Sequence, residues 1–332
     1  MKEPFKLKNW QLLRWKGKCA QADLTAVEVF TLGKGAFQNC RELEEVTLPA
    51  SLTTVKAKAF LGCRRLKRVS LSADGSVGLS ASVFEGCQRL KGIENSERIT
   101  SVGRRAFKNC LTLASFSFGK SVRKIGEEAF RNCRSITTIT VPSCVKTIEK
   151  NAFCGCWELE ELTLEDGLET LSVGAFRECI SLGAIQIPSG IGEIPNDAFR
   201  DCSALGEIAL PATVKTVGRS AFRGCLSLKT VTMELGVSAV GAFAFADNEA
   251  LESVTVPHSL SKLGFGAFGL GRREKKTVIY VDNEYMCRRM KRLLFWCGSA
   301  GRAVVCMQGK TIEERKRERR RTSLDQKAEH IS

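Results

Sequence analysis

Cysteine is the residue type in this chain best suited to chemistry, because its thiolate can act as a nucleophile, a metal ligand or half of a disulfide. There are fifteen cysteines, and nine of them recur every 23 or 24 residues: Cys40, Cys63, Cys87, Cys110, Cys133, Cys156, Cys179, Cys202 and Cys225. A zinc site usually needs cysteines paired about two to four residues apart, and Cys154 and Cys156 are the one close pair. We therefore expect buried, reduced thiols that pack as small apolar side chains. Reduced thiols favour a reducing, cytosolic setting.

Other residue types that support catalysis are sparse. Of the two histidines, His258 follows a proline where other repeats carry alanine or serine, and His330 lies close to the C-terminal end of the sequence. The sequence contains no G-x-S-x-G motif, phosphate-binding glycine loop or cluster of metal-ligating residues. The adjacent acids Glu165 and Asp166 are expected to lie in a solvated turn. The sequence therefore predicts no catalytic residue, no metal, no cofactor and no enzyme activity.

The cysteines belong to a repeat marked by phenylalanine. Each of the nine follows a phenylalanine by three positions, and the repeat phenylalanines are Phe37, Phe60, Phe84, Phe107, Phe130, Phe153, Phe176, Phe199, Phe222, Phe245 and Phe268. A constant period of about 20–50 residues is the signature of a solenoid, whose function usually lies in its extended surface. Apolar residues recur at six, nine and eleven positions after each phenylalanine, and again at fifteen and eighteen.

This spacing predicts the local structure of one repeat. Alternation at positions nine and eleven indicates a short strand whose positions eight and ten face outward. Proline often follows at position twelve and would end that strand. Glycine at position nineteen, as in Gly103 and Gly126, suits a tight turn, and a short helical or 3₁₀ turn is expected around Ala-Phe-x-x-Cys. One repeat cannot bury its own apolar side, so stacked repeats must share one core.

The segments Leu43–Leu52 and Ala59–Cys63 resemble the leucine-rich repeats of the BspA-like family, and the match extends over roughly residues 24 to 280. The resemblance implies a right-handed, curved leucine-rich repeat solenoid, mostly β, with a parallel sheet on one face. It also implies a protein-interaction role, often at a microbial or protist cell surface.

Four regions are expected along the chain. Residues 1–23 would form an N-terminal cap or a degraded repeat, and residues 24–271 the solenoid of about eleven units. Residues 272–307 would form a strand–helix–strand cap that shields the last core layer. Residues 308–332 would form a basic, charged tail, either disordered or helical. We expect a monomer.

Charge is concentrated at the two ends. The whole chain carries +15, of which residues 1–25 hold +4 and residues 272–332 hold +9. The tail contains a basic run: Arg315, Lys316, Arg317, Arg319, Arg320 and Arg321. Such a run is typical of nucleic-acid-binding or nuclear-localisation segments, and Ser323 beside it is a candidate phosphorylation site. The alternative is a solvated tail without a function of its own.

The outward strand positions form the candidate binding face. In the central repeats they are Thr138, Thr140, Glu161, Thr163, Gln186, Glu207, Thr230 and Thr232. The leading hypothesis is a non-enzymatic scaffold that binds protein partners through this face. The alternative is association with nucleic acid or an anionic membrane through the basic tail.

No run of 18 apolar residues is present, so no transmembrane segment is expected. The first residues lack the apolar stretch of a signal peptide. These features favour the cytoplasm, with the nucleus as an alternative, and the cell surface would need residues upstream of this sequence.

Overall fold

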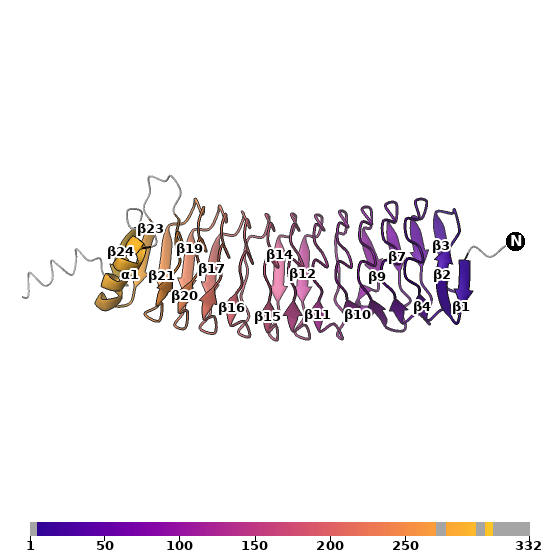
Figure 1. Cartoon of the computed structure of the whole chain (residues 1–332), viewed down its shortest axis with the longest axis horizontal. Coiled ribbons are helices and arrows are strands. Elements are labelled where there is room, and N and C mark those ends of the chain that lie inside the picture. Colours follow the sequence, from indigo (N-terminus) through magenta and orange to yellow (C-terminus); the bar gives the residue numbers. More distant parts are fainter. Residues whose placement is uncertain (1–4, 270–276, 297–302, 308–332) are drawn as a thin grey trace, which may run out of the picture.

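A computed structural model describes residues 5–269, 277–296 and 303–307. The described residues wind into a rod of stacked turns, with the N-terminal strands at one end and helix α1 (Glu284–Trp296) at the other (Figure 1). In most of the turns each strand residue pairs with the residue 23 or 24 positions later, as Thr138 does with Glu161, Glu207 with Thr230 and Arg68 with Gly92. The predicted solenoid of mostly β structure is therefore confirmed, and the sequence period is the length of one turn.

Two ladders of strands run along the rod, and their pairs are parallel except for the antiparallel pair of β1 and β2. The long-strand ladder comprises β3 (Gln21–Asp23), β5 (Glu45–Thr47), β7 (Arg68–Ser70), β9 (Gly92–Glu94), β12 (Thr138–Val141), β14 (Glu161–Leu164), β17 (Glu207–Leu210), β19 (Thr230–Met233), β21 (Ser253–Val256), β23 (Thr277–Val281) and β24 (Ala303–Met307). The short-strand ladder comprises β1 (Phe5–Lys8), β2 (Gln11–Trp15), β4 (Thr31–Leu32), β6 (Thr54–Val55), β8 (Val77–Leu79), β10 (Ile99–Val102), β11 (Lys124–Ile125), β13 (Thr147–Ile148), β15 (Thr170–Leu171), β16 (Glu193–Ile194), β18 (Thr216–Val217), β20 (Ala239–Val240) and β22 (Lys262–Leu263).

The second ladder adds to the single parallel sheet that the family resemblance implies. The short strands coincide with the second apolar stretch of each repeat, around positions seventeen and eighteen. The backbone beside buried apolar side chains must satisfy its own hydrogen-bonding groups. The second apolar stretch of each repeat therefore pairs with the same stretch of the adjacent turns.

The core is a column of stacked aromatic rings. All eleven repeat phenylalanines are fully buried, and the ring centroids of neighbours lie 4.8–5.6 Å apart. Trp15 stacks on Phe37 at 5.4 Å and continues the column by one turn. The segment Phe5–Asp23 thus contributes an antiparallel hairpin, β1–β2, and a first turn whose β3 pairs with β5.

The turns around the repeat phenylalanines differ from the expected helical or 3₁₀ turns. Among the described residues, those two positions before and two after the repeat phenylalanines adopt left-handed backbone conformations, as Arg105 (φ 56°) and Asn109 (φ 61°) do around Phe107. The left-handed residues turn every second amide N–H group so that it points along the rod. The N–H groups of Arg105, Phe107 and Asn109 therefore donate to carbonyl oxygens of the next turn at 2.7–2.8 Å. Among the described residues, the one 3₁₀ helix is Ser96–Arg98.

The glycines at position nineteen serve a different purpose from the one expected. Gly103 and Gly126 do not adopt the left-handed conformation. Instead, a Cβ added to Gly103 would lie 2.6 Å from the carbonyl carbon of Ser80 on the preceding turn. These positions require glycine because neighbouring backbones approach too closely for a side chain.

At the other end, helix α1 (Glu284–Trp296) lies between β23 and β24 in the chain. Met286, Met290 and Leu294 are buried and belong to the same hydrophobic core as the repeats. The amide N–H of Met286 donates to the side-chain oxygen of Asn283 at 2.8 Å, which is an N-cap hydrogen bond. The described part of the chain contains no helix with the length and apolar character needed to cross a membrane.

Candidate binding face

All eight predicted partner-binding residues lie on the long-strand ladder or in line with it. Thr138 and Thr140 lie on β12, Glu161 and Thr163 on β14, Glu207 on β17, and Thr230 and Thr232 on β19. Gln186 occupies the equivalent position on the turn between β14 and β17. Each is at least partly exposed, while the alternate residues of the same strands, such as Ile139 and Ile208, are buried.

The ladder is interrupted in the middle of this face. Residues 184–187 form no strand, and in the described structure their backbone amide and carbonyl groups make no hydrogen bond to either neighbouring turn. On the opposite side of the same turn, β16 pairs with β18 but not with β15. Both strand ladders are therefore broken between the turn of β14 and the turn that follows it.

Glycine and proline are frequent in the broken turn. The broken turn contains Gly183, Pro188, Gly190, Gly192 and Pro195. Glycine weakens strand pairing and proline lacks the amide donor. The turn stays in the stack because its Phe176 ring lies 5.2 Å from Phe153 and 5.6 Å from Phe199, and because turns around the phenylalanines remain hydrogen bonded to each other.

A second interruption, at residues 115–118, has a different cause. Phe116 and Phe118 occupy the two inward strand positions there. Their rings pack edgewise on Phe130 at centroid distances of 5.0 and 5.7 Å. The aromatic side chains fill this rung of the core, and Phe118 also lines a separate depression of about 350 Å³ together with Ile99 and Thr100 of β10.

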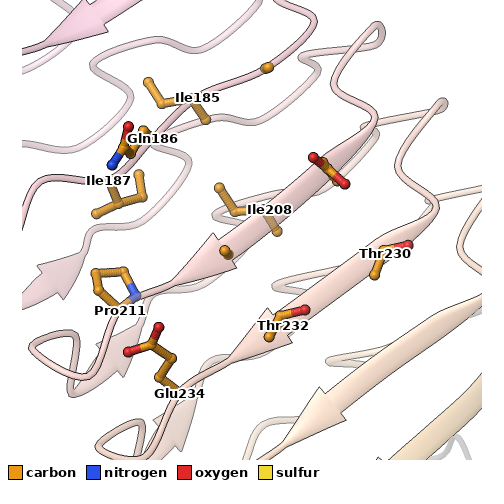
Figure 2. Close-up of a pocket in the computed structure, with 11 residues that line it drawn as sticks. Ile185, Gln186, Ile187, Ile208, Pro211, Thr230, Thr232 and Glu234 are labelled. Carbon is orange, nitrogen blue, oxygen red and sulfur yellow. The ribbon is translucent and has the colours of Figure 1, made fainter.

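A depression of about 440 Å³ lies beside the interrupted segment. Figure 2 shows Ile185, Gln186 and Ile187 along one side and Thr230, Thr232 and Glu234 on the other, with Ile208 and Pro211 between them. Ala184 and Ala209 also line it, and Glu207 completes the lining. Alanine occupies the outward positions 184 and 209, where most other turns carry longer side chains.

The charge of the face changes along the rod. Near the N-terminal end, Glu44 pairs with Lys67 at 2.7 Å and Glu45 with Arg68 at 3.5 Å, so positive and negative groups offset each other. In the centre, the side-chain carboxylates of Glu161 and Glu207 have no hydrogen bond or ion pair among the described residues. No lysine or arginine lines the depression. The central face is therefore polar and mildly acidic.

The cysteine column is structural. The thiols of Cys63, Cys87, Cys110, Cys133, Cys156, Cys179, Cys202 and Cys225 are buried, and each donates a hydrogen bond to the carbonyl oxygen of the phenylalanine on the preceding turn, at 2.9–3.4 Å. Burial raises the pKa of Cys225 to about 12 and those of Cys110 and Cys133 well above the usual range. Cysteines in this state are poor nucleophiles.

The remaining candidates for chemistry are isolated. His258, expected in an exposed loop, is 54 % exposed and its Nδ1 lies 2.5 Å from a carboxylate oxygen of Asp282. No group of three or more metal-ligating side chains occurs in the part of the chain that the structure describes. The basic tail, with Arg315, Lys316, Arg317, Arg319, Arg320, Arg321 and the candidate phosphosite Ser323, lies outside the described residues.

Sequence reasoning missed the interruption, the depression and the lack of cations beside Glu161 and Glu207. The signal for the interruption was present as the glycine- and proline-rich segment 183–195. It also missed Trp157, which is 39 % exposed and lies 3.8 Å below the guanidinium of Arg134.

Comparison with known proteins agrees with this architecture. The family described as "BspA type Leucine rich repeat region" matches in six copies over residues 19–91, 77–206 and 192–279. A leucine-rich cell surface protein from Faecalibacterium prausnitzii has a similar structure, with a TM-score of 0.54, 20 % identity, and coverage of 92 % of this chain and 93 % of that one.

Two further structures show the same fold. The pneumococcal vaccine antigen PcpA gives a TM-score of 0.54 at 20 % identity, over 84 % of this chain and 71 % of that one. A leucine-rich repeat protein from Eubacterium ventriosum gives 0.51 at 16 % identity, over 80 % and 90 %. No curated protein matches the chain.

Proposed function

The chain belongs to the BspA-type leucine-rich repeat family, and from this premise we propose that it is a non-enzymatic scaffold that binds a partner protein through the centre of its long-strand ladder. The interrupted rung at residues 184–187, with the depression beside it, is the observation that supports this placement. Elsewhere the face presents ladders of paired strands, a rung filled by the rings of Phe116 and Phe118 or, near its N-terminal end, mutually paired charges. Here it presents unpaired backbone groups and short side chains, over which a partner can approach closely.

Two glycines on the same turn allow a matched test. Gly183 precedes the interrupted segment and Gly192 precedes β16 on the opposite ladder; a Cβ at either position meets nothing within 4 Å, and neither glycine is left-handed. Gly183→Trp should therefore block the proposed face, and Gly192→Trp should block the opposite one, without disturbing the fold. Circular dichroism and thermal unfolding would verify that both variants are folded.

The experiment is affinity capture from a lysate of the source organism with the full chain and both variants. Proteins captured by the wild-type chain should be lost with Gly183→Trp and retained with Gly192→Trp. Capture that survives Gly183→Trp, or that both variants abolish equally, would contradict the placement of the binding site.

We also propose that the protein works in a reducing compartment. The support is the thiol column: eight core cysteines donate S–H hydrogen bonds, which only the reduced, protonated side chain can do. Measurement of the cysteine oxidation state in protein isolated from its native cells, by alkylation and mass spectrometry, tests this. Disulfides within the column would contradict it.

A further inference from the structure

The depression beside residues 184–187 has features that select a particular kind of partner segment. Its lining contains two carboxylates, Glu207 and Glu234, and no positive charge. Both side chains are exposed. The Glu207 carboxylate has no hydrogen bond or ion pair in the described structure, and Glu234 uses one oxygen to accept the amide N–H of Ala212 at 3.0 Å. The depression therefore has no positive charge of its own to pair with these two carboxylates.

Neighbouring cations do not supply that charge. Lys215 donates to the carbonyl oxygen of Ala212 at 2.9 Å and forms no ion pair with Glu234. Lys229, one residue before β19, makes no ion pair in the described structure and does not line the depression. In contrast, the N-terminal turns pair Glu44 with Lys67 across adjacent strands.

The two carboxylates stand at opposite ends of the depression. Glu207 begins β17, and Glu234 follows β19 at the level of Pro211, because Leu210 pairs with Met233. Four residues of strand therefore separate them along the strand direction, which is about 13 Å at 3.3 Å per residue. Between them the lining is short or apolar, with Ala209 at the outward position of β17.

We propose that this depression binds an extended segment of a partner protein that carries two arginine or lysine residues four positions apart. In an extended chain, residues i, i+2 and i+4 project from the same side, and i and i+4 are about 13 Å apart. The two basic groups then meet Glu207 and Glu234, and a small residue at i+2 faces Ala209. The methylene stems of the basic residues pack on apolar lining such as Ile185 and Pro211.

This inference deepens the proposed function and rests on it, and binding of designed peptides to the full chain tests it. The probe is fluorescein-labelled Thr-Arg-Thr-Ala-Thr-Arg-Thr, in which the arginines are four positions apart. A control peptide carries glutamine in place of both arginines, and another places the arginines two positions apart. A fourth peptide has the sequence of residues 308–332, which tests whether the chain's own basic tail is the occupant.

Fluorescence anisotropy at low salt should show that the first peptide binds more tightly than both control peptides. Glu207→Gln and Glu234→Gln should each weaken it about two- to fivefold, as expected for exposed ion pairs. Glu193→Gln removes an exposed carboxylate from the opposite ladder and should leave binding unchanged. Higher salt should weaken the interaction because exposed charges are screened.

Three results would overturn the inference. These are equal affinity for the arginine and glutamine peptides, equal weakening by Glu193→Gln and Glu207→Gln, or tighter binding of the 308–332 peptide at the same carboxylates. The peptide-binding result can be distinguished from the test of the proposed function. If Gly183→Trp abolishes protein capture but the basic peptides do not bind, the face is an interaction site for another chemistry. If neither holds, both proposals fail.

Discussion

Glu128 is a buried carboxylate on which the stability of its part of the rod should depend. Its side chain is 7 % exposed and accepts hydrogen bonds from Arg105 at 2.6 Å, Lys108 at 2.9 Å and Arg131. Burial opposes its ionisation, but hydrogen bonds from the three cations prevail and lower the pKa of Glu128 from its ordinary value of 4.5 to about 2. The carboxylate therefore holds together cations from two adjacent turns.

The pKa shift sets the expected magnitude. The lowering of the pKa of Glu128 from 4.5 to about 2 corresponds to roughly 3 kcal/mol of stabilisation from the ionised form. Glu128→Gln removes the charge but keeps the size of the side chain, and leaves three cations without their partner. We expect a loss of about 3 kcal/mol near pH 7. Because the pKa is lower in the folded state, this stabilisation is complete above about pH 5 and disappears as the pH falls from 4.5 towards 2.

Native-state hydrogen exchange is the suitable assay, since long repeat arrays do not always unfold in one cooperative step. The amide of Phe107, which donates to Ala129 on the next turn at 2.7 Å, reports the local free energy of opening. Glu127→Gln is the matched control, because Glu127 makes an exposed ion pair with Arg104 at 3.1 Å and should cost less than about 1 kcal/mol. Equal effects of the two variants, or a Glu128→Gln effect that persists undiminished at pH 2, would refute the reasoning.

Three further predictions follow from the core. Phe153→Ala should cost about 3–5 kcal/mol locally, read from exchange or denaturant unfolding, since the ring is fully buried between two others; a loss below 1 kcal/mol would show that the column is loosely packed. Gly103→Ala should lower the thermal midpoint by forcing the backbones of two turns apart, whereas Gly92→Ala, where a Cβ meets nothing, should not; equal midpoints would refute the close-approach argument. Maleimide at pH 8 should label exposed Cys19 but not Cys133, because burial holds the pKa of the latter well above its usual range; rapid labelling of both would contradict a closed core.

The regular spacing of the repeated residues was sufficient to predict the fold class and the buried core. A period of 23 residues became the register of both ladders, and positions such as Phe153 and Cys133 are buried as the pattern requires. The resemblance also identified the family. These features are predictable because they repeat, so each residue type is supported by many equivalent positions.

The local backbone was harder to predict. The left-handed residues around each phenylalanine include Arg105, Glu128 and Phe243, residue types that rarely adopt this conformation. Hydrogen bonds between stacked turns impose it, and no propensity of the single residue reveals that. The role of Gly103 likewise depends on the distance to the neighbouring turn, which the sequence does not contain.

The predicted outward residues do lie along the long-strand ladder. The interruption at residues 184–187 and the depression beside it were not predicted. A period describes what turns share, and the depression arises where one turn departs from the others, at Gly183, Ala184 and the prolines that follow. Whether the outward residues bind a partner is still a prediction.

The most direct test of the account is hydrogen-exchange mapping of the full chain with and without a partner identified by capture. The unpaired amides of residues 185–187 should exchange quickly in the free protein, while the β17 amides that face β19 are protected. On binding, protection should rise at residues 183–187 and around Ala209, and stay unchanged at β16 and β18 on the opposite ladder. Protection that appears only on the opposite ladder, or only at the ends of the chain, would contradict binding at the centre of the long-strand ladder.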